Sequence, residues 1–258
     1  MRLFGMQHYV QLLEASRTAG YRCASFSEPV SDQRTLWLRH DVDNCLVSAL
    51  RMAQVEHAYG IRSTYLLLLR TDNYNLLSRS SRRLVDQIAR LGHDIGLHFS
   101  LYEHPDSGSV ADLITRDAQL LADVLERPVD VFAFHNPPES VDYTLAVPGL
   151  TNAYSPVHFS PEAYLSESNM RWRSDPVQLL LSGRQRRLQI LVHPLSYAGE
   201  LKTDHDVLLY FLKMKLLDLL RYNQGQNRTL WNAPLSLAEA LEKMAGGDTQ
   251  AAEVCRHD

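Results

Sequence analysis

Two aspartates lie one residue apart, directly after an apolar run. The segment Leu36–Cys45 reads LWLRHDVDNC, so Asp41 and Asp43 follow Arg39 at intervals of two residues. In a strand, alternate side chains point to opposite faces, which places these three charged residues together on one face. The other face carries residues suited to packing, which are Leu36, Leu38, His40 and Val42. The pattern predicts a strand with one packing face and one face for chemistry.

Three histidines stand at or near the ends of three further apolar segments. His98 lies near the end of the segment HDIGLHFS, His135 ends the segment VFAFH, and His193 ends the segment LQILVH. In parallel α/β folds the carboxyl ends of the strands form one rim, and ligands bind there. We therefore expect the aspartate pair and the three histidines to converge on one site.

These residue types indicate metal chemistry. One carboxylate and two imidazoles, with one position open to water, are typical ligands of zinc or another divalent transition metal. Such a metal lowers the pKa of its water toward 7, and a second carboxylate can accept the proton. A single histidine is more often structural, but three at successive strand ends favour a metal-dependent hydrolytic site.

The elements that must position these residues alternate along the chain. We predict strands over 35–42, 62–69, 93–100, 129–138, 150–157 and 187–194, and helices over 7–18, 44–60, 80–92, 109–126, 204–225 and 234–247. An irregular stretch, 164–176, separates the last two strands. The alternation favours an α/β fold with a parallel sheet or barrel. No linker-like segment interrupts it, so residues 1–247 are expected to form one domain before a flexible tail at 248–258.

Composition limits the partners and the compartment. The net charge is -4 and the basic residues are scattered, so no nucleic-acid partner is expected. Cys23, Cys45 and Cys255 are too far apart to suggest a disulfide framework. The first residues lack the continuous apolar region of a signal peptide, and no run is long enough for a membrane span. We expect a cytoplasmic protein, whose oligomeric state the sequence leaves open.

Four motifs resemble a known family. RHDVD, GHDIGLH, FHNPP and LVHP occur in this order between Leu36 and Pro194. They are similar to the motifs of the polysaccharide deacetylase superfamily (NodB-like, carbohydrate esterase family 4), and most similar to its branch of bacterial polysaccharide-biosynthesis deacetylase-like proteins. The resemblance implies a distorted (β/α)7 barrel. It also implies hydrolysis of an N- or O-acyl group, such as acetyl, on a sugar, with one divalent metal. Zinc is the first expectation, and cobalt and nickel are alternatives.

The resemblance also implies roles for individual residues. Asp41 would be the general base, Asp43 and His98 would be metal ligands, and His193 would be the acid that protonates the leaving group. Substrate contacts are expected at three further positions, which are Asn136, Trp172 and Tyr197. An aromatic residue in an irregular segment can equally be a buried anchor for a loop.

Two positions depart from the family pattern. Tyr102 stands where the second motif usually has its second histidine, and a phenol with a pKa near 10 is a poor zinc ligand. His135 and His104 are the possible substitutes, and we prefer His135 because it ends a strand whereas His104 lies in a loop-like segment. Asn136 stands where an arginine usually orients the base.

Arg39 could take over the task of that arginine, because it shares a strand face with Asp41.

The leading interpretation is a metal-dependent deacetylase acting on an acylated sugar or a nucleotide- or lipid-linked sugar. A glycosidase is disfavoured because Asp41 and Asp43 leave one strand, whereas glycosidase carboxylates flank the bond from opposite sides. The alternative is a metal-poor relative that only binds carbohydrate or a partner protein.

Overall fold

The structure is a computed structural model that describes residues 4–104, 108–168, 170–199, 201 and 203–226. The chain divides into two compact units, Met1–Val207 and Leu208–Asp258. The prediction of one domain over residues 1–247 stays a prediction, because residues 227–258 lie outside the described residues. The predicted helix at 234–247 and the predicted tail also lie there.

A parallel sheet forms the centre of the first unit. Within the described residues, seven parallel strands follow the order β6-β5-β4-β3-β2-β9-β7, and β8 pairs antiparallel with β7. The strands are β1 (Arg22–Cys23), β2 (Thr35–Val42), β3 (Thr64–Leu68), β4 (Asp94–Phe99), β5 (Val131–Phe134), β6 (Thr151–Asn152), β7 (Tyr164–Ser168), β8 (Arg171–Trp172) and β9 (Arg187–Val192). The short strand β1 pairs with the first residues of β2. The predicted α/β fold of the distorted (β/α)7-barrel type is confirmed, and the sheet is curled into a half-barrel.

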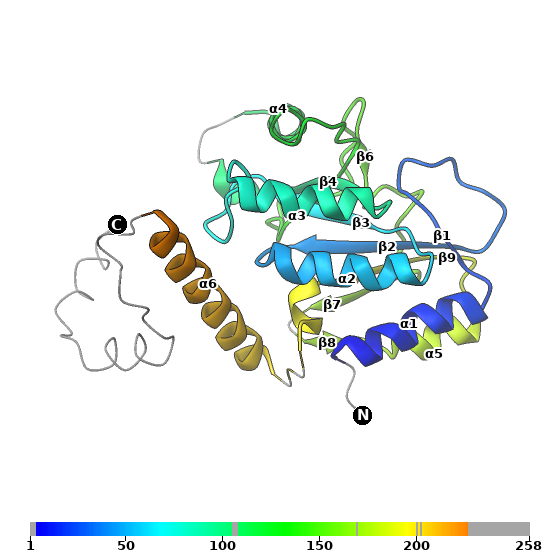
Figure 1. Ribbon diagram of the computed structural model, residues 1–258. Coiled ribbons are helices and arrows are strands. Elements are labelled where there is room, and N and C mark those ends of the chain that lie inside the picture. Colours follow the sequence, from blue (N-terminus) through cyan, green and yellow to red (C-terminus); the bar gives the residue numbers. More distant parts are fainter. Residues whose placement is uncertain (1–3, 105–107, 169, 200, 202, 227–258) are drawn as a thin grey trace. The chain divides into compact units, whose positions relative to one another are not determined.

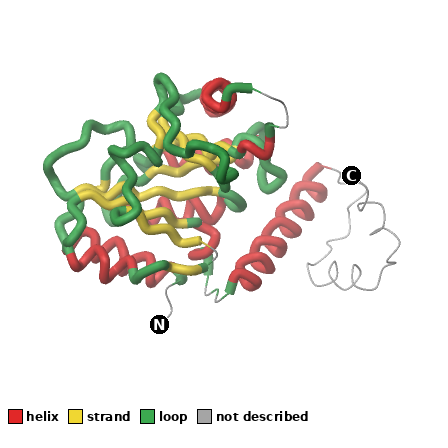
Figure 2. Tube along the Cα trace, turned by 180° about the vertical axis from the view of Figure 1, so that it is seen from behind, coloured by secondary structure: helices red, strands yellow, loops and turns green. Residues whose placement is uncertain are grey.

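Helices cover the outer face of this sheet. In this unit they are α1 (Met6–Thr18), α2 (Leu46–Ala58), α3 (Arg79–Arg90), α4 (Val110–Leu125) and α5 (Pro176–Ser182), with the short helices η1 (Leu101–Glu103) and η2 (Pro194–Tyr197) in the loops. The long helix α6 (Asp204–Gln226) belongs mostly to the second unit. Figure 1 shows α2 and α3 side by side in front of the sheet, and Figure 2 shows that loops lie over the opposite face. None of the helices in the described part of the chain has the length and apolar character needed to cross a membrane.

Strand β2 shows how the sequence alternation builds these two layers. All of its residues are buried. Leu36 and Leu38 pack with Leu12 of α1 on the helix-covered face. Trp37 points the other way and packs with Phe26. Burying apolar area on both faces stabilises the strand by roughly 25 cal/mol per Å², so β2 is a rigid support for the charged residues near its end.

One carboxylate is buried between α2 and the sheet. Glu56 of α2 is fully buried. Its oxygens contact Tyr9, His40 Nε2 at 2.6 Å, Ser63 Oγ at 2.6 Å and the Tyr65 hydroxyl at 2.6 Å. Burial by itself opposes ionisation, but the charge and hydrogen bond of His40 outweigh it and lower the pKa of Glu56 to about 2. The cluster therefore ties α2 to β2 through an ionised group.

This cluster predicts a loss of stability in acid. A glutamate in the unfolded chain has a pKa near 4.3, so as the pH falls from there toward 2 the unfolded chain binds a proton that folded Glu56 does not. The difference corresponds to roughly 3 kcal/mol of stability at neutral pH. We expect Glu56→Gln to be less stable at pH 7 and to show a flatter decline in unfolding free energy between about pH 4.5 and 2. Urea unfolding across this range checks it, with the exposed Glu162→Gln as control; equal slopes in both variants would contradict it.

The second half of the unit departs from the sequence prediction. Residues 150–157, predicted as one strand, form only the short β6, because Asn152 Oδ1 accepts the N–H of Tyr154 and turns the chain. The stretch 164–176, predicted as irregular, contains β7 and the hairpin to β8. Its register comes from β9, which pairs Ser166 with Leu191. The elements β1 and α5 were not predicted.

Candidate active site

Four strand ends bring the predicted charged residues together. Asp41 lies in β2 and Asp43 directly follows it, while His98 lies near the end of β4. His135 follows β5, and His193 follows β9. These strands are parallel and β2 lies between β3 and β9, so all their carboxyl ends share one rim of the sheet. The expected convergence of the five side chains is observed.

Three of these residues direct ligand atoms to one point. His98 Nε2 lies 3.2 Å from Asp43 Oδ1 and 3.1 Å from His135 Nδ1, and His135 Nδ1 lies 3.6 Å from Asp43 Oδ1. Around a tetrahedral zinc ion with bonds of about 2.0 to 2.1 Å, neighbouring ligand atoms are about 3.3 Å apart. The group Asp43, His98 and His135 therefore fits one tetrahedral ion.

The hydrogen bonds of His98 support the same assignment. Its Nδ1 lies 3.3 Å from the carbonyl oxygen of Ala133, so Nδ1 carries the proton and donates it. The Nε2 lone pair then faces Asp43 Oδ1 and the His135 ring nitrogen. Two lone pairs and a carboxylate at such distances repel one another unless a cation or a proton lies among them. The three side chains therefore form a group that could hold a metal ion.

Arg39 and Asp41 form a buried ion pair beside this group. Arg39 Nε donates to Asp41 Oδ1 and Nη2 donates to Oδ2, both at 2.7 Å. Burial opposes the charge on Asp41, but the charge and hydrogen bonds of Arg39 outweigh it, and the pKa of Asp41 is lowered. Asp41 is therefore ionised at neutral pH. Its Oδ2 lies 3.3 Å from His98 Nε2, so a carboxylate adjoins the three ligand atoms.

His193 faces the same point from β9. Its Nε2 lies 3.7 Å from Asp43 Oδ2, and its Nδ1 lies 2.7 Å from the Glu167 carbonyl oxygen and 3.2 Å from Glu167 Oε2. Burial disfavours a charged imidazole, but the hydrogen bond to Glu167 and the nearby Asp43 outweigh it and raise the pKa of His193 to about 9. At neutral pH His193 is an imidazolium with Nδ1 held by Glu167 and Nε2 toward Asp43.

Glu167 of β7, for which no role was predicted, is the partner of His193. Its side chain is 1% exposed. Oε1 accepts hydrogen bonds from Ser196 Oγ at 3.2 Å and from the Met170 N–H at 3.0 Å, which fixes Oε2 beside His193. Residues 164–176 were predicted to be irregular. No strand pairing therefore indicated that Glu167 would lie next to His193.

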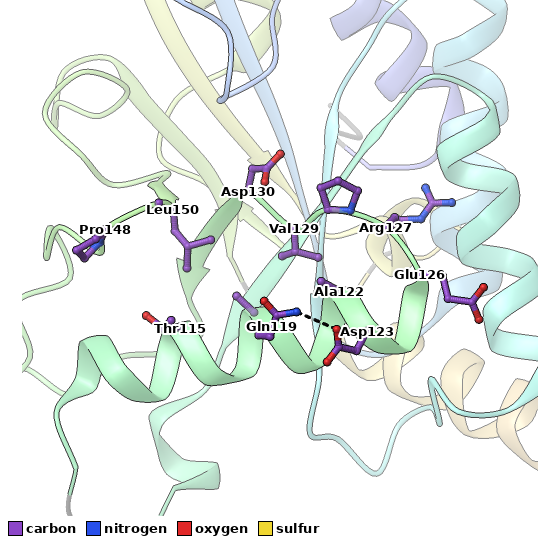
Figure 3. Close-up of a pocket in the computed structure, with 13 residues that line it drawn as sticks. Thr115, Gln119, Ala122, Asp123, Glu126, Arg127, Val129, Asp130, Pro148 and Leu150 are labelled. Atoms are coloured by element: carbon purple, nitrogen blue, oxygen red, sulfur yellow. Dashed lines mark hydrogen bonds between the residues drawn. The ribbon is translucent and has the colours of Figure 1, made fainter.

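A cavity elsewhere in this unit does not contain the site. It has a volume of about 690 Å³ and lies between α4 and the loops that precede β5 and β6 (Figure 3). Asp130 and Leu150 line it at the amino ends of these strands, opposite the rim that carries His135. Gln119 donates to Asp123 along its helical wall at 2.8 Å. None of the predicted site residues is among the described residues that line it.

Comparisons with known proteins give low-identity structural matches. No protein-family model and no curated protein matches the chain. A CE4 family pseudoenzyme from Bacillus anthracis matches with a TM-score of 0.41 and 14% identity over 71% of this chain and 62% of that chain. A family 4 acetyl xylan esterase from Clostridium thermocellum, in complex with a cobalt ion, matches with a TM-score of 0.39 and 14% identity over 70% and 84%. A peptidoglycan deacetylase from Bdellovibrio bacteriovorus matches with a TM-score of 0.39 and 17% identity over 76% and 54%.

The chain resembles polysaccharide deacetylases of the CE4 family. It spans 64%, 62% and 64% of the first three structures that it matches, which are the pseudoenzyme and two of its mutants. The TM-scores of these three matches lie below 0.5.

Its two departures from the deacetylase motifs have visible consequences. Tyr102 is 69% exposed, and His104 Nε2 lies 2.8 Å from Asp117 Oδ2. Of the two possible substitutes for the missing histidine, the structure brings His135 to Asp43 and His98 and places His104 in a separate pair. Asn136, at the arginine position, has a positive φ of 42° and directs Nδ2 to His135 Nε2 at 3.4 Å.

Of the other two predicted substrate contacts, Tyr197 is buried and Trp172 is half-buried. Tyr197 is 1% exposed and packs against Tyr9, with ring centroids 5.5 Å apart, so its ring offers no surface to a sugar in this structure. Trp172 is half-buried and packs against the same core. The position of Trp172 agrees with the expected alternative of a loop anchor. Contact of either residue with substrate stays a prediction.

Proposed function

We propose that this protein is a metal-dependent hydrolase that removes an acyl group, in the first instance acetyl, from a sugar. The observation that supports it best is a possible metal site flanked by an ionised carboxylate, Asp41, and a charged imidazole, His193. Hydrolysis of an amide or ester needs a group that receives a proton from water and a group that gives one to the departing amine or alcohol. Asp41 and His193 have the protonation states for these two tasks.

One divalent cation is the proposed cofactor, with zinc first and cobalt or nickel as alternatives. Asp43 Oδ1, His98 Nε2 and His135 Nδ1 would hold it. When bound, it supplies a Lewis acid that lowers the pKa of water and polarises an acyl carbonyl. With Nδ1 of His135 on the ion, Nε2 carries the ring proton, so Asn136 would orient this ring with its amide turned to present Oδ1 as the acceptor.

Asp41 is proposed to receive the proton of the attacking water. Arg39 fixes the carboxylate plane through two hydrogen bonds and keeps it ionised. Arg39 is therefore proposed for the orienting task that the family pattern gives to the arginine at the position of Asn136.

His193 is proposed to protonate the leaving group. We expect His193→Ala to retain metal affinity and to lose roughly 100- to 10,000-fold in kcat, the usual contribution of a general acid. Glu167→Gln keeps the shape of the partner but removes its charge, so the pKa of His193 should fall and the alkaline limb of the pH–rate profile should move to lower pH. Metal titration and pH–rate profiles of both variants check these roles. Loss of metal from His193→Ala would show that His193 is a ligand.

The proposed substrate is an acylated sugar, either free or linked to a nucleotide or lipid. This choice follows from the expected cytoplasmic location, where biosynthetic precursors occur. The test is acetate release from N-acetyl and O-acetyl sugars by protein loaded with zinc, cobalt or nickel. Stoichiometric metal with acetate release is the expected result. Substoichiometric metal and no acetate release would favour the alternative, a metal-poor relative that only binds carbohydrate or a partner protein.

A further inference from the structure

The loop that joins β3 to α3 contacts the end of β2 through two side chains, those of Asn73 and Tyr74. The Tyr74 hydroxyl donates to the carbonyl oxygen of Val42 at 2.7 Å and accepts the N–H of Leu68 at 2.8 Å. Asn73 Nδ2 donates to the carbonyl oxygen of Asp43 at 3.0 Å. No role was predicted for either side chain.

The Tyr74 hydroxyl lies where the pairing between β2 and β3 ends. These strands are parallel, and their last paired residues are Val42 and Leu67. In this register, the next acceptor and donor along a parallel ladder are the Val42 carbonyl and the Leu68 N–H. Both of these groups bond to the hydroxyl. Tyr74 therefore bridges the two strands at the point where the chain leaves β2 and continues to Asp43.

This bridge lies between two of the proposed metal ligands. On one side of β3, Leu68 pairs with His98 of β4, and on the other side its N–H reaches the Tyr74 hydroxyl. Asp43 directly follows Val42, which bonds to the same hydroxyl. Because β3 separates β2 from β4, the position of Asp43 relative to His98 depends on how the ends of β2 and β3 part.

The Tyr74 hydroxyl keeps its proton at neutral pH. Tyr74 packs against the hydrophobic cluster that contains Val42 and Leu67. Burial is the main cause of a raised pKa of Tyr74, and the charge of Asp43 raises this pKa further. A neutral phenol can donate one hydrogen bond and accept another, which is what the bridge between the two strands requires.

Asn73 fixes the next carbonyl group of the chain. Its backbone N–H donates to Thr71 Oγ1 at 3.1 Å, while its side chain bonds to the Asp43 carbonyl oxygen. Two successive side chains of one loop thus hold the two successive carbonyl groups of Val42 and Asp43. These groups belong to the peptide units on either side of the Asp43 Cα atom, so the direction in which its carboxylate leaves the backbone is restricted.

We propose that Tyr74 and Asn73 are positioning residues that hold Asp43 in the geometry of the metal site. This role rests on the proposed function, in which Asp43 is a ligand, and it makes metal affinity depend on the loop after β3. Without the hydroxyl, the Leu68 N–H and the Val42 carbonyl are free to bond to each other directly. That bond would draw the ends of β2 and β3 together and move Asp43 from its present place.

Calorimetric titration with zinc tests these two roles. Loss of a group that orients a ligand costs about 10- to 100-fold in metal affinity, so we expect Tyr74→Phe and Asn73→Ala each to weaken zinc binding by about this factor. Tyr21→Phe is the matched control, because Tyr21 is buried and its hydroxyl donates to the carbonyl oxygen of Gln185. Asn75→Ala is the control for Asn73, since the Asn75 side chain bonds within the same loop. Both controls should bind zinc like the unchanged protein.

Two further measurements separate positioning from a general loss of stability. The visible absorption of bound cobalt reports the geometry of its ligands, so it should change in Tyr74→Phe and not in Tyr21→Phe. In the Asp43→Asn background, Tyr74→Phe should have a smaller effect on zinc affinity, because residues that act through one another are not additive. Thermal unfolding shows which variants are folded, and Asn73→Ala provides the test if Tyr74→Phe is not.

The outcomes distinguish these roles from the proposed function. Zinc affinity equal to that of the unchanged protein in folded Tyr74→Phe, or in folded Asn73→Ala, would overturn the role of that residue and leave the proposed metal site standing. Absence of zinc binding by the unchanged protein would overturn both.

Discussion

Replacing His98 by alanine is expected to abolish binding of a divalent metal. His98 Nε2 is the central atom of the site, because it lies 3.1 to 3.3 Å from His135 Nδ1, Asp43 Oδ1 and Asp41 Oδ2. Loss of a residue that only orients a ligand already costs about 10- to 100-fold in metal affinity. Loss of the ligand itself should cost more than a hundredfold, and it also removes one corner of the tetrahedron.

Calorimetric titration with zinc measures this loss. His104→Ala is the matched control, since His104 is a histidine of the same region whose partner is Asp117 instead of Asp43. Its metal affinity should equal that of the unchanged protein. Full zinc binding by His98→Ala, or loss of binding in His104→Ala, would contradict the assignment of His98 and of His135 as the third ligand.

Replacing Asp41 by asparagine is expected to eliminate hydrolysis while metal binding remains. Asparagine has nearly the same shape as aspartate but cannot accept a proton at neutral pH, so kcat should fall by roughly 100- to 10,000-fold. Asp43→Asn should instead weaken metal binding, because a carboxylate oxygen is lost from the ligand set. The two variants are thus expected to differ: Asp41→Asn keeps metal binding and loses turnover, whereas Asp43→Asn loses metal affinity.

The buried partner of Asp41 adds a second expectation. Asp41→Asn leaves the guanidinium of Arg39 without an anion in a site where both side chains are buried. Removing one member of a buried ion pair typically costs 3 to 5 kcal/mol, so the variant should also unfold at a lower temperature. Acetate release and zinc content are therefore measured well below its unfolding temperature. Full turnover by Asp41→Asn, or equal loss of zinc from both variants, would refute the division of tasks.

The sequence alone predicted the elements that depend on local pattern. The alternation around Leu36 and Leu38 placed β2 at 35–42, as observed, and helical periodicity placed α1 to within one residue of its start. The gathering of charged residues at one rim was also predictable, because strands joined by helices run parallel and their carboxyl ends meet.

Only the tertiary structure decided which distant residues meet. Glu167 reaches His193 because β7 pairs with β9. The ring of Tyr154, which follows β6, lies over the guanidinium of Arg39 in β2. His104 lies 6 residues after His98 and His135 lies 37 residues after it. Nevertheless His104 pairs with Asp117 of α4, and it is the more distant His135 that lies beside Asp43 at the rim. These outcomes depend on pairings between segments far apart in the chain, and periodicity within one segment carries no information about its partner.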